Sequence, residues 1–244
     1  MNRFSGQFNN IPPVTRNLLL INVVVFFVTM LFGRMFNINL SRTLGLFYFQ
    51  SPFFGPWQIV THMFMHGGLT HIFFNMWALF MFGKTLESVW GGKRFLVYYL
   101  ATGLGAAFFH SLVLYLQLGP EVAQLKAAYS VDQINMSLLN EIMKPGNPYY
   151  SLGRSLLTPT VGASGAVYGV LLAFGMLFPN TQLFIIPIPF PIKAKWLVIG
   201  FGALELFLGV TQTGGNIAHF AHLGGMIFGF ILIKYWNRHS QNFY

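Results

Sequence analysis

Apolar residues form six long runs along this chain, and each run ends at a polar residue, a proline or a glycine. The runs cover roughly 17–33, 66–83, 94–117, 162–178, 195–211 and 217–236. A helix needs about 20 apolar residues to cross the ~30 Å core of a bilayer, and backbone groups in lipid must be hydrogen-bonded internally. The runs are too long for barrel strands, so the pattern predicts an all-α membrane protein with a bundle of six transmembrane helices.

Two connecting segments interrupt this pattern. In the segment 34–61, an apolar stretch from Leu44 to Phe54 is broken by proline and followed by glycine and proline. This favours a first loop that is partly embedded in the membrane over a seventh span. The segment 118–161 is the only long polar stretch, which could gate a site, although a linker is the expected role.

The composition supports a membrane protein with little room for a soluble domain. Of the 244 residues, 55% are hydrophobic and only 8% are charged, and the mean hydropathy is +0.58. A soluble globular domain is far less apolar. We therefore expect one membrane domain over 17–236, which includes the outer loop 118–161, between a short cytoplasmic N-terminus 1–16 and a tail 237–244.

The charges indicate orientation more than a charged partner. The net charge of +9 comes from Lys and Arg scattered between the apolar runs, so no nucleic acid is expected as a partner. Nine of the 14 Lys and Arg residues fall on the side of the N-terminus, which predicts an N-in, C-in arrangement, and we expect a bacterial inner (plasma) membrane. The absence of cysteine excludes disulfides, thiolate metal sites and cysteine nucleophiles; the oligomeric state stays open.

Polar side chains within the apolar runs are the candidates for function, because such groups are costly at membrane depth. They are His62, His66, His71 and Asn75 around the second run, Ser164 and Tyr168 in the fourth, and His219 and His222 in the sixth. At about 1.5 Å per residue, His71, Ser164 and His222 all lie about 20 to 22 Å above the inner ends of their runs. We expect this common level to lie roughly 8–10 Å below the outer face.

Small residues would let two of these runs approach closely. They are Gly165 and Gly169 in the fourth run and Gly225 and Gly229 in the sixth. Such stripes at four-residue spacing allow helix backbones to come together. Close packing would put the Ser164 hydroxyl beside the His222 imidazole, as a nucleophile and its general base require.

The surroundings of Ser164 favour acyl transfer. The sequence Val161–Gly165 places Ser164 at a Gly-rich helix start, where free backbone N–H groups can stabilise an oxyanion. His71 and Asn75, one turn apart on the second run, could donate side-chain hydrogen bonds to the same charge.

No carboxylate is expected beside His222. Asp132, the only Asp, lies in the polar loop, and Glu205 in the fifth run lies about 15 Å above the inner face, deeper than His222. We therefore predict a dyad of Ser164 and His222, in which Tyr168 could stack on the imidazole ring. Glu205 could be protonated and hydrogen-bonded to a neighbouring helix, or it could mark a proton path.

Three motifs resemble, in order and spacing, those of rhomboid intramembrane proteases. They are His66 followed by His71-Ile-Phe-Phe-Asn75, Gly162-Ala-Ser-Gly165 with Tyr168, and Ala221-His222-Leu-Gly-Gly225 with Gly229. The resemblance spans roughly residues 44–230. A GxSG sequence alone is weak, but the three motifs on six apolar runs together are specific.

The resemblance implies a six-helix rhomboid-like core with a Ser164–His222 dyad and no metal or other cofactor. His71, Asn75 and the Ser164 backbone would form the oxyanion hole, and Gly162 would help to shape it. The implied substrates are transmembrane helices of single-pass proteins, cut near the outer membrane surface.

Two features depart from the family pattern. Trp57 is followed by Gln58 where the family commonly has arginine, so the hydrogen bonds of that arginine must be replaced or weakened. The loop 118–161 is also longer than in compact bacterial members.

Non-catalytic roles for these polar residues, and functions other than proteolysis, stay open. Taken alone, a serine in a Gly-rich helix is more often a packing residue. His62 and His66 are expected to be structural, and His219 could line a wet entrance or lie at the interface. The chain could also be an inactive rhomboid-like binder of transmembrane helices, or a transporter or metal-binding protein that uses its seven histidines, although no H-E-x-x-H motif is present.

Overall fold

The structure, a computed structural model, describes residues 11–184, 190–211 and 217–239, and most of these residues are helical. The longer helices are α2 (Pro13–Phe36), α5 (Leu69–Ala78), α7 (Gly92–Tyr129), α10 (Ser164–Leu177), α11 (Ala194–Thr211) and α12 (Ile217–His239). The shorter ones are α3 (Leu40–Leu44), α4 (Gln58–Thr61), the 3-10 turn η1 (His62–Phe64), the π-helical turn η2 (Leu79–Gly83), α6 (Lys84–Trp90), α8 (Met136–Ile142) and α9 (Tyr150–Leu157). A two-stranded antiparallel hairpin, β1 (Gln182–Leu183) and β2 (Ile192–Lys193), precedes α11.

Among the described residues, four helices are long and apolar enough to cross a membrane: α2, α7, α11 and α12. The fourth predicted run forms α10, an apolar helix of 14 residues. The second run is divided, since α5 passes through the π turn η2 into α6. The all-α membrane fold is therefore confirmed, whereas the count of six spans remains a prediction.

The ends of several elements differ from the predicted limits. Helix α2 begins at Pro13, which is well suited to the first turn because it has no backbone N–H to leave unpaired. The expected terminal segments 1–16 and 237–244 lie largely outside the described residues. Helix α7 does not stop near residue 117 but continues through Pro120 to Tyr129.

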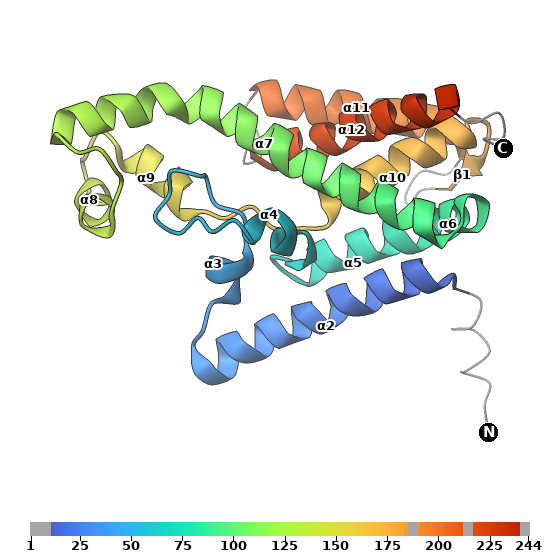
Figure 1. Cartoon of the computed structure of the whole chain (residues 1–244), viewed down its shortest axis with the longest axis horizontal. Coiled ribbons are helices and arrows are strands. Elements are labelled where there is room, and N and C mark those ends of the chain that lie inside the picture. The colour runs from blue at the N-terminus through green and yellow to red at the C-terminus, as the bar shows by residue number, and fades with distance from the viewer. Residues whose placement is uncertain (1–10, 185–189, 212–216, 240–244) are drawn as a thin grey trace.

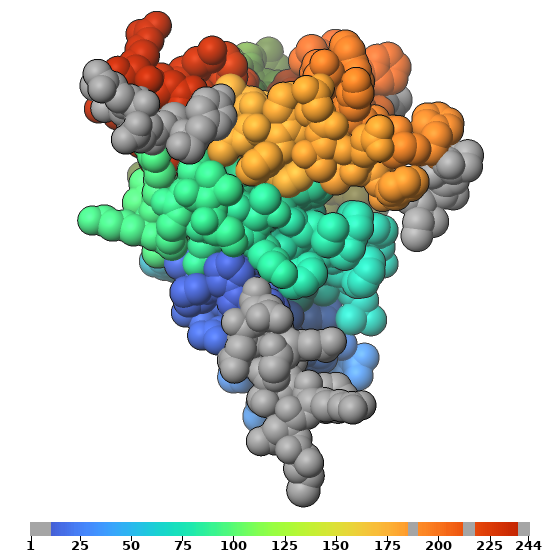
Figure 2. All heavy atoms as spheres, turned by 90° about the vertical axis from the view of Figure 1, so that its right-hand side faces the viewer, coloured from blue at the N-terminus to red at the C-terminus, as the bar shows by residue number. Residues whose placement is uncertain are grey.

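The helices form layers, with α2 on one side, the α5–α6 segment between, and α10, α11 and α12 on the other side (Figure 1). Viewed from the end near α6, the same order appears from bottom to top (Figure 2). Helix α7 runs diagonally across the bundle and packs against both α10 and α12. Its Tyr98 and Tyr99 are fully buried in the main core.

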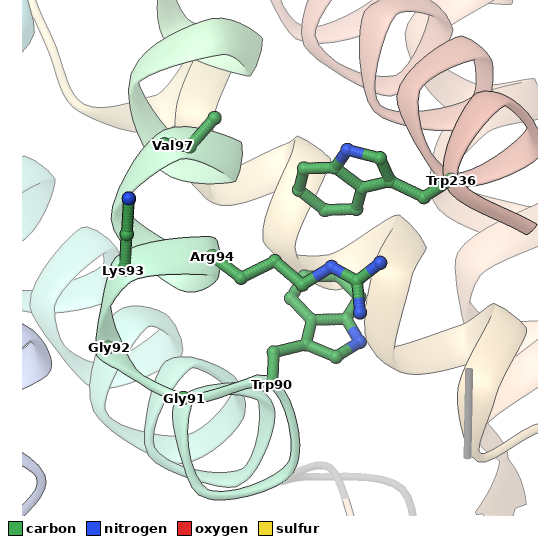
Figure 3. Close-up of a pocket in the computed structure, with 7 residues that line it drawn as sticks. All are labelled: Trp90, Gly91, Gly92, Lys93, Arg94, Val97 and Trp236. Atoms are coloured by element: carbon green, nitrogen blue, oxygen red, sulfur yellow. The ribbon is translucent and has the colours of Figure 1, made fainter. Parts of the chain in front are cut away.

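At one end of the bundle, aromatic side chains join α6, α7 and α12. The indole rings of Trp90 and Trp236 meet edge to face, 5.8 Å apart, and the Arg94 guanidinium lies 4.7 Å from the Trp236 ring (Figure 3). Arginine over an indole face is a favourable cation–π arrangement. This cluster therefore holds the start of α7 against the end of α12.

Helix α2 is fastened to the bundle by a carboxylate. Glu87 of α6 is buried and accepts hydrogen bonds from the backbone N–H groups of Val14 and Thr15, at 2.9 and 2.6 Å, and from the Thr15 hydroxyl at 2.7 Å. A helix start leaves N–H groups unpaired and favours negative charge. Glu87 thus caps α2 from another helix.

The segment 118–161 is a folded unit, so the expectation of a simple linker is wrong. The end of α7, with α8 and α9, projects beyond the bundle (Figure 1). These helices share a second hydrophobic core with residues of the first loop. Its buried members are Tyr48, Leu114, Val122, Leu125, Ile134, Leu138, Leu139, Ile142, Leu152 and Leu156. We call residues 118–157, together with Tyr48 and Phe53 of the first loop, the cap.

Gln58, at the position where the family commonly has arginine, forms three hydrogen bonds within the first loop. Its side chain is fully buried; its Oε1 accepts from the Phe47 backbone N–H at 3.2 Å, and its Nε2 donates to the carbonyls of Phe53 at 2.8 Å and Thr43 at 3.3 Å. Three separate backbone positions of the first loop are therefore fixed by one amide, which can both donate and accept.

Candidate active site

The structure brings Ser164 and His222 together. Ser164 is the first residue of α10, and His222 lies in the second turn of α12. Ser164 Oγ and His222 Nε2 are hydrogen-bonded at 2.8 Å. This is the distance at which a general base can take a proton from a hydroxyl nucleophile.

A turn with an unusual backbone places Ser164. Gly162 has φ of +137°, a conformation that side chains rarely adopt, and its N–H donates to the His62 carbonyl at 2.9 Å. A Cβ at Gly162 would lie 2.9 Å from the His71 ring and 3.4 Å from Ser164 Oγ. Only glycine therefore lets the turn pass so close to both side chains.

The two proposed oxyanion donors, His71 and Asn75, lie on the side of α5 that faces Ser164. His71, Asn75 and Ser164 line one cavity, and Asn75 is buried with its Nδ2 donating to the His71 carbonyl at 2.9 Å. The His71 Nδ1 accepts from the Gly67 N–H at 3.3 Å. With Nδ1 accepting, His71 carries its ring proton on Nε2, which is then available as a donor.

Tyr168 stacks on His222. The rings are 4.3 Å apart and nearly parallel, at 5°. Tyr168 lies one turn after Ser164 in α10, so a single helix carries both the serine and the ring that supports its partner. The face of the imidazole is covered, and its edge remains free to bond in its own plane.

Glu205 lies against His222, and the expectation that no carboxylate reaches this histidine is wrong. Glu205 is buried in α11, and its Oε1 lies 3.0 Å from His222 Nδ1. By helix rise, the backbone of Glu205 was expected about one turn deeper than that of His222. The long Glu205 side chain bridges this difference in height. The contacts of Glu205 with α10 and α12 confirm the expected hydrogen bonds to a neighbouring helix, whereas nothing in the structure tests the protonated carboxyl that this alternative included.

Two further contacts hold the Glu205 carboxylate. His219 Nδ1 lies 2.6 Å from Oε2, and the Tyr168 hydroxyl donates to Oε1. His219 is therefore linked to the site through Glu205, a role that neither sequence alternative for it included. The signal in the sequence was a buried Glu in an apolar run together with two histidines one turn apart.

These residues are also the group that could hold a metal ion in the described part of the chain. One ligand atom each from Glu205, His219 and His222 lies within 4.8 Å of the others. The short contacts from both histidines to the carboxylate account for the cluster without an ion. We therefore assign no cofactor to it.

The glycine stripes meet more than one helix. A Cβ at Gly225 of α12 would overlap the Gly165 carbonyl oxygen of α10, so these two backbones touch as expected. Gly169 instead faces Thr102 of α7, at 2.6 Å from its Cβ position, and Gly229 faces Tyr98. All four glycines therefore lie at helix contacts, as expected, and α7 in addition packs into the space left by Gly169 and Gly229.

A cavity of about 960 Å³ opens beside Ser164. Its walls come from α5, α10 and α11, with Phe74, Trp77 and Phe201 among the apolar side chains, and with His71, Ser164 and His222 supplying polar atoms. Phe74 and Trp77 are exposed at the outer surface of α5. The open side of the cavity is thus lined by apolar side chains, and the part next to Ser164 is lined by polar ones.

The other two histidines of the second run are buried beside the site. His62 Nδ1 bonds to the Gln58 carbonyl at 2.8 Å, and its own carbonyl holds Gly162. The His66 ring packs edge-on against His71, with centroids 5.1 Å apart. Both placements suit the structural roles expected for them.

Comparison with known proteins gives a consistent result. The Rhomboid domain family model matches residues 53–238. The chain is 26% identical over 228 residues to rhomboid protease AarA of Providencia stuartii, covering 90% of this chain and 70% of that protein. It is 26% identical over 176 residues to rhomboid protease GluP of Bacillus subtilis, covering 71% of this chain and 25% of that protein.

A mitochondrial protein is similar as well. Rhomboid protein 1 of Saccharomyces cerevisiae is 25% identical over 174 residues, covering 70% of this chain and 39% of that protein. The chain therefore spans well under half of the length of the yeast protein and of GluP. With the family match extending over most of the sequence, this chain belongs to the rhomboid family and is a membrane-embedded serine protease of the rhomboid type.

Proposed function

We propose that this protein cleaves transmembrane segments of single-pass membrane proteins near the outer membrane face, with Ser164 as nucleophile and His222 as general base. The observation that carries the proposal is the 2.8 Å hydrogen bond between Ser164 Oγ and His222 Nε2. Two polar side chains from apolar segments far apart in the sequence meet here, and polar groups within membrane segments need a functional or structural reason.

In the first half of the reaction, Ser164 Oγ attacks the carbonyl carbon of the scissile bond and His222 Nε2 takes its proton. The oxyanion receives hydrogen bonds from the Ser164 backbone N–H, His71 and Asn75. When the intermediate collapses, His222 gives the proton to the leaving amine and an acyl-enzyme on Ser164 remains.

In the second half, a water molecule attacks the acyl carbon. His222 takes a proton from this water, and the second intermediate expels Ser164 Oγ, which recovers the proton. The product carboxylate leaves, and the hydroxyl is restored. Only side chains and backbone groups of the chain are needed, so we propose no metal or other cofactor.

The cavity beside Ser164 supports a substrate that arrives from the bilayer. It lies between α5 and α11, and apolar side chains such as Phe74 and Phe201 line it. A transmembrane segment could enter between these helices while its apolar residues stay in contact with apolar surface. The polar end at the serine would then receive a short unwound stretch of the segment.

We further propose the N-in, C-in orientation in a bacterial inner membrane. The distribution of Lys and Arg supports the orientation. The curated relatives include both bacterial and mitochondrial proteins, so the choice of a bacterial membrane rests on the similarity to AarA and GluP.

The test is cleavage of a generic transmembrane substrate by purified protein in liposomes. We expect wild type to cleave and to be labelled by a fluorophosphonate, and we expect Ser164→Ala to lose both. His222→Ala should lose cleavage while the protein stays folded. A well-folded wild type that neither cleaves nor labels with several substrates would favour the inactive binder of transmembrane helices.

A further inference from the structure

We propose that Glu205 is a positioning residue for His222, so that Ser164, His222 and Glu205 form a triad in place of the expected dyad. This inference rests on the proposed function of Ser164 and His222. It adds a third residue, from α11, whose carboxylate determines which nitrogen of His222 faces the serine.

The carboxylate is the point where three helices meet. Glu205 of α11 is only 5% exposed, its Oε1 is contacted by Tyr168 of α10 and its Oε2 by His219 of α12. Its Oε1 also lies 3.0 Å from His222 Nδ1. Buried carboxylates are stable only when hydrogen-bonded or paired, and this one has three polar partners.

The His222 atom of this contact is buried as well. His222 Nδ1 is buried and, among the described residues, has no aligned hydrogen-bond acceptor. The nearest carboxylate oxygen is within hydrogen-bond distance but off the line of the N–H bond.

The chemical consequence is a fixed tautomer. A neutral imidazole carries its proton on one nitrogen and accepts on the other. With the proton on Nδ1 facing Glu205, the lone pair of Nε2 faces Ser164, as general-base catalysis requires. The carboxylate also stabilises the imidazolium that forms when His222 takes the serine proton.

Tyr168 and His219 hold the Glu205 carboxylate in position. The Tyr168 ring stacks on His222 while its hydroxyl bonds to Glu205, so one side chain fixes the distance between the imidazole and the carboxylate. His219 binds the other oxygen. Glu205 is therefore held against rotation on both sides.

Two substitutions of Glu205 and one matched control test this role by kinetics. Glu205→Gln keeps the shape but removes the charge and can present an N–H to Nδ1, which favours the wrong tautomer. We expect kcat to fall on the order of 10²-fold or more, with KM little changed. Glu205→Asp keeps the carboxylate and should recover part of kcat.

The control is Glu87→Gln, another buried glutamate that accepts three hydrogen bonds from a different helix. If buried carboxylates act only by holding helices together, Glu87→Gln and Glu205→Gln should lower the melting temperature and reduce kcat to similar extents. We expect both to lower the melting temperature, but only Glu205→Gln to lower kcat selectively.

A second readout does not depend on activity. In protein labelled with 15N-histidine at alkaline pH, the ring nitrogens of His222, assigned with His222→Asn, report which nitrogen is protonated. We expect the Nδ1-protonated form in wild type and a shift of the populations in Glu205→Gln and Glu205→Leu.

The outcomes separate this inference from the proposed function. Cleavage that depends on Ser164 but is unchanged in Glu205→Gln, with unchanged His222 spectra, overturns the triad and leaves the protease intact. An inactive wild type overturns the proposed function, and the spectra then decide alone whether Glu205 orients His222.

Discussion

The backbone of Gly225 in α12 touches the carbonyl oxygen of Gly165 in α10, with no room for a methyl group between them. Each residue lies close in sequence to one member of the proposed Ser164–His222 pair. Because these two backbones are in contact, a change at this point separates α12 from α10 and lengthens the hydrogen bond between the pair.

Gly225→Ala should therefore reduce both stability and cleavage. Forcing extra volume into a packed contact costs about 1–3 kcal/mol, and the displaced His222 should lower kcat as well. Thermal unfolding and cleavage rates measure the two effects. Gly200→Ala in α11 is the control, since a Cβ there has nothing within 4 Å; equal losses in both variants would contradict the contact.

Gly162→Ala should abolish labelling by a fluorophosphonate. The new Cβ would strain the backbone at φ +137° and lie 2.9 Å from the His71 ring, which displaces the proposed oxyanion donors. Gly146→Ala separates the two causes, because Gly146 has φ of +85° with nothing near its Cβ. We expect Gly146→Ala to lose some stability but to keep its labelling rate; a parallel loss of labelling would contradict a specific role for Gly162.

Gln58→Leu should destabilise the first loop. It leaves the Phe47 N–H and the Phe53 carbonyl without their buried partner, and each unsatisfied group costs about 1–3 kcal/mol. A lower melting temperature is expected. Gln124→Leu, at an exposed position of α7, should change stability by at most about 0.5 kcal/mol, and an equal effect at both positions would refute the role of Gln58.

Ile142→Ala should loosen the cap while the membrane bundle stays folded. Ile142 is fully buried in the second hydrophobic core, and truncation of such a residue costs about 2–5 kcal/mol. Limited proteolysis should cut 130–148 faster than in wild type. Met136→Ala, at an exposed position, should keep the wild-type cleavage pattern; if both variants resist protease equally, the cap is not an independent core.

Chelators should leave cleavage unchanged. Glu205, His219 and His222 lie close enough to hold a metal ion, but the proposed reaction uses the histidine and the carboxylate directly. Treatment of purified protein with a strong chelator, followed by the cleavage assay with and without added zinc, checks this. A loss that zinc restores would make the cluster a metal site and remove Glu205 from the proposed triad.

The sequence sufficed for those features that one helix determines by itself. The length of the apolar runs indicated the membrane helices, and the number of residues below each polar group predicted a common depth for Ser164 and His222. The stacking of Tyr168 on His222 followed from a spacing of one turn. These inferences depend on helix rise and on the cost of polar groups in lipid. The contact of Ser164 with His222 agrees with a common level, whereas the depth of that level in the membrane stays a prediction.

Features that depend on the reach of side chains or on distant partners could not be predicted. The contact of Glu205 with His222 requires a side chain to bridge a difference in backbone height. The cap looked like a polar loop because its apolar residues are spread over the end of α7 and two short helices, α8 and α9. They meet partners such as Tyr48 and Leu114 only in the fold. The pattern of apolar residues within one segment does not show which distant residues will pack against it.

The cap is joined to the serine by very little chain. Leu46 and Thr160 pair backbone to backbone, at 2.9 and 2.8 Å, and Gly162 follows two residues later. Peptide tags or fluorescent reporters should therefore be inserted at the tips of the cap, in 130–133 or 144–147, where the chain turns outside the helices. Deletions in 158–161 would pull the Ser164 turn directly, so chimaeras with shorter relatives should exchange the whole cap and keep the Leu46–Thr160 pair.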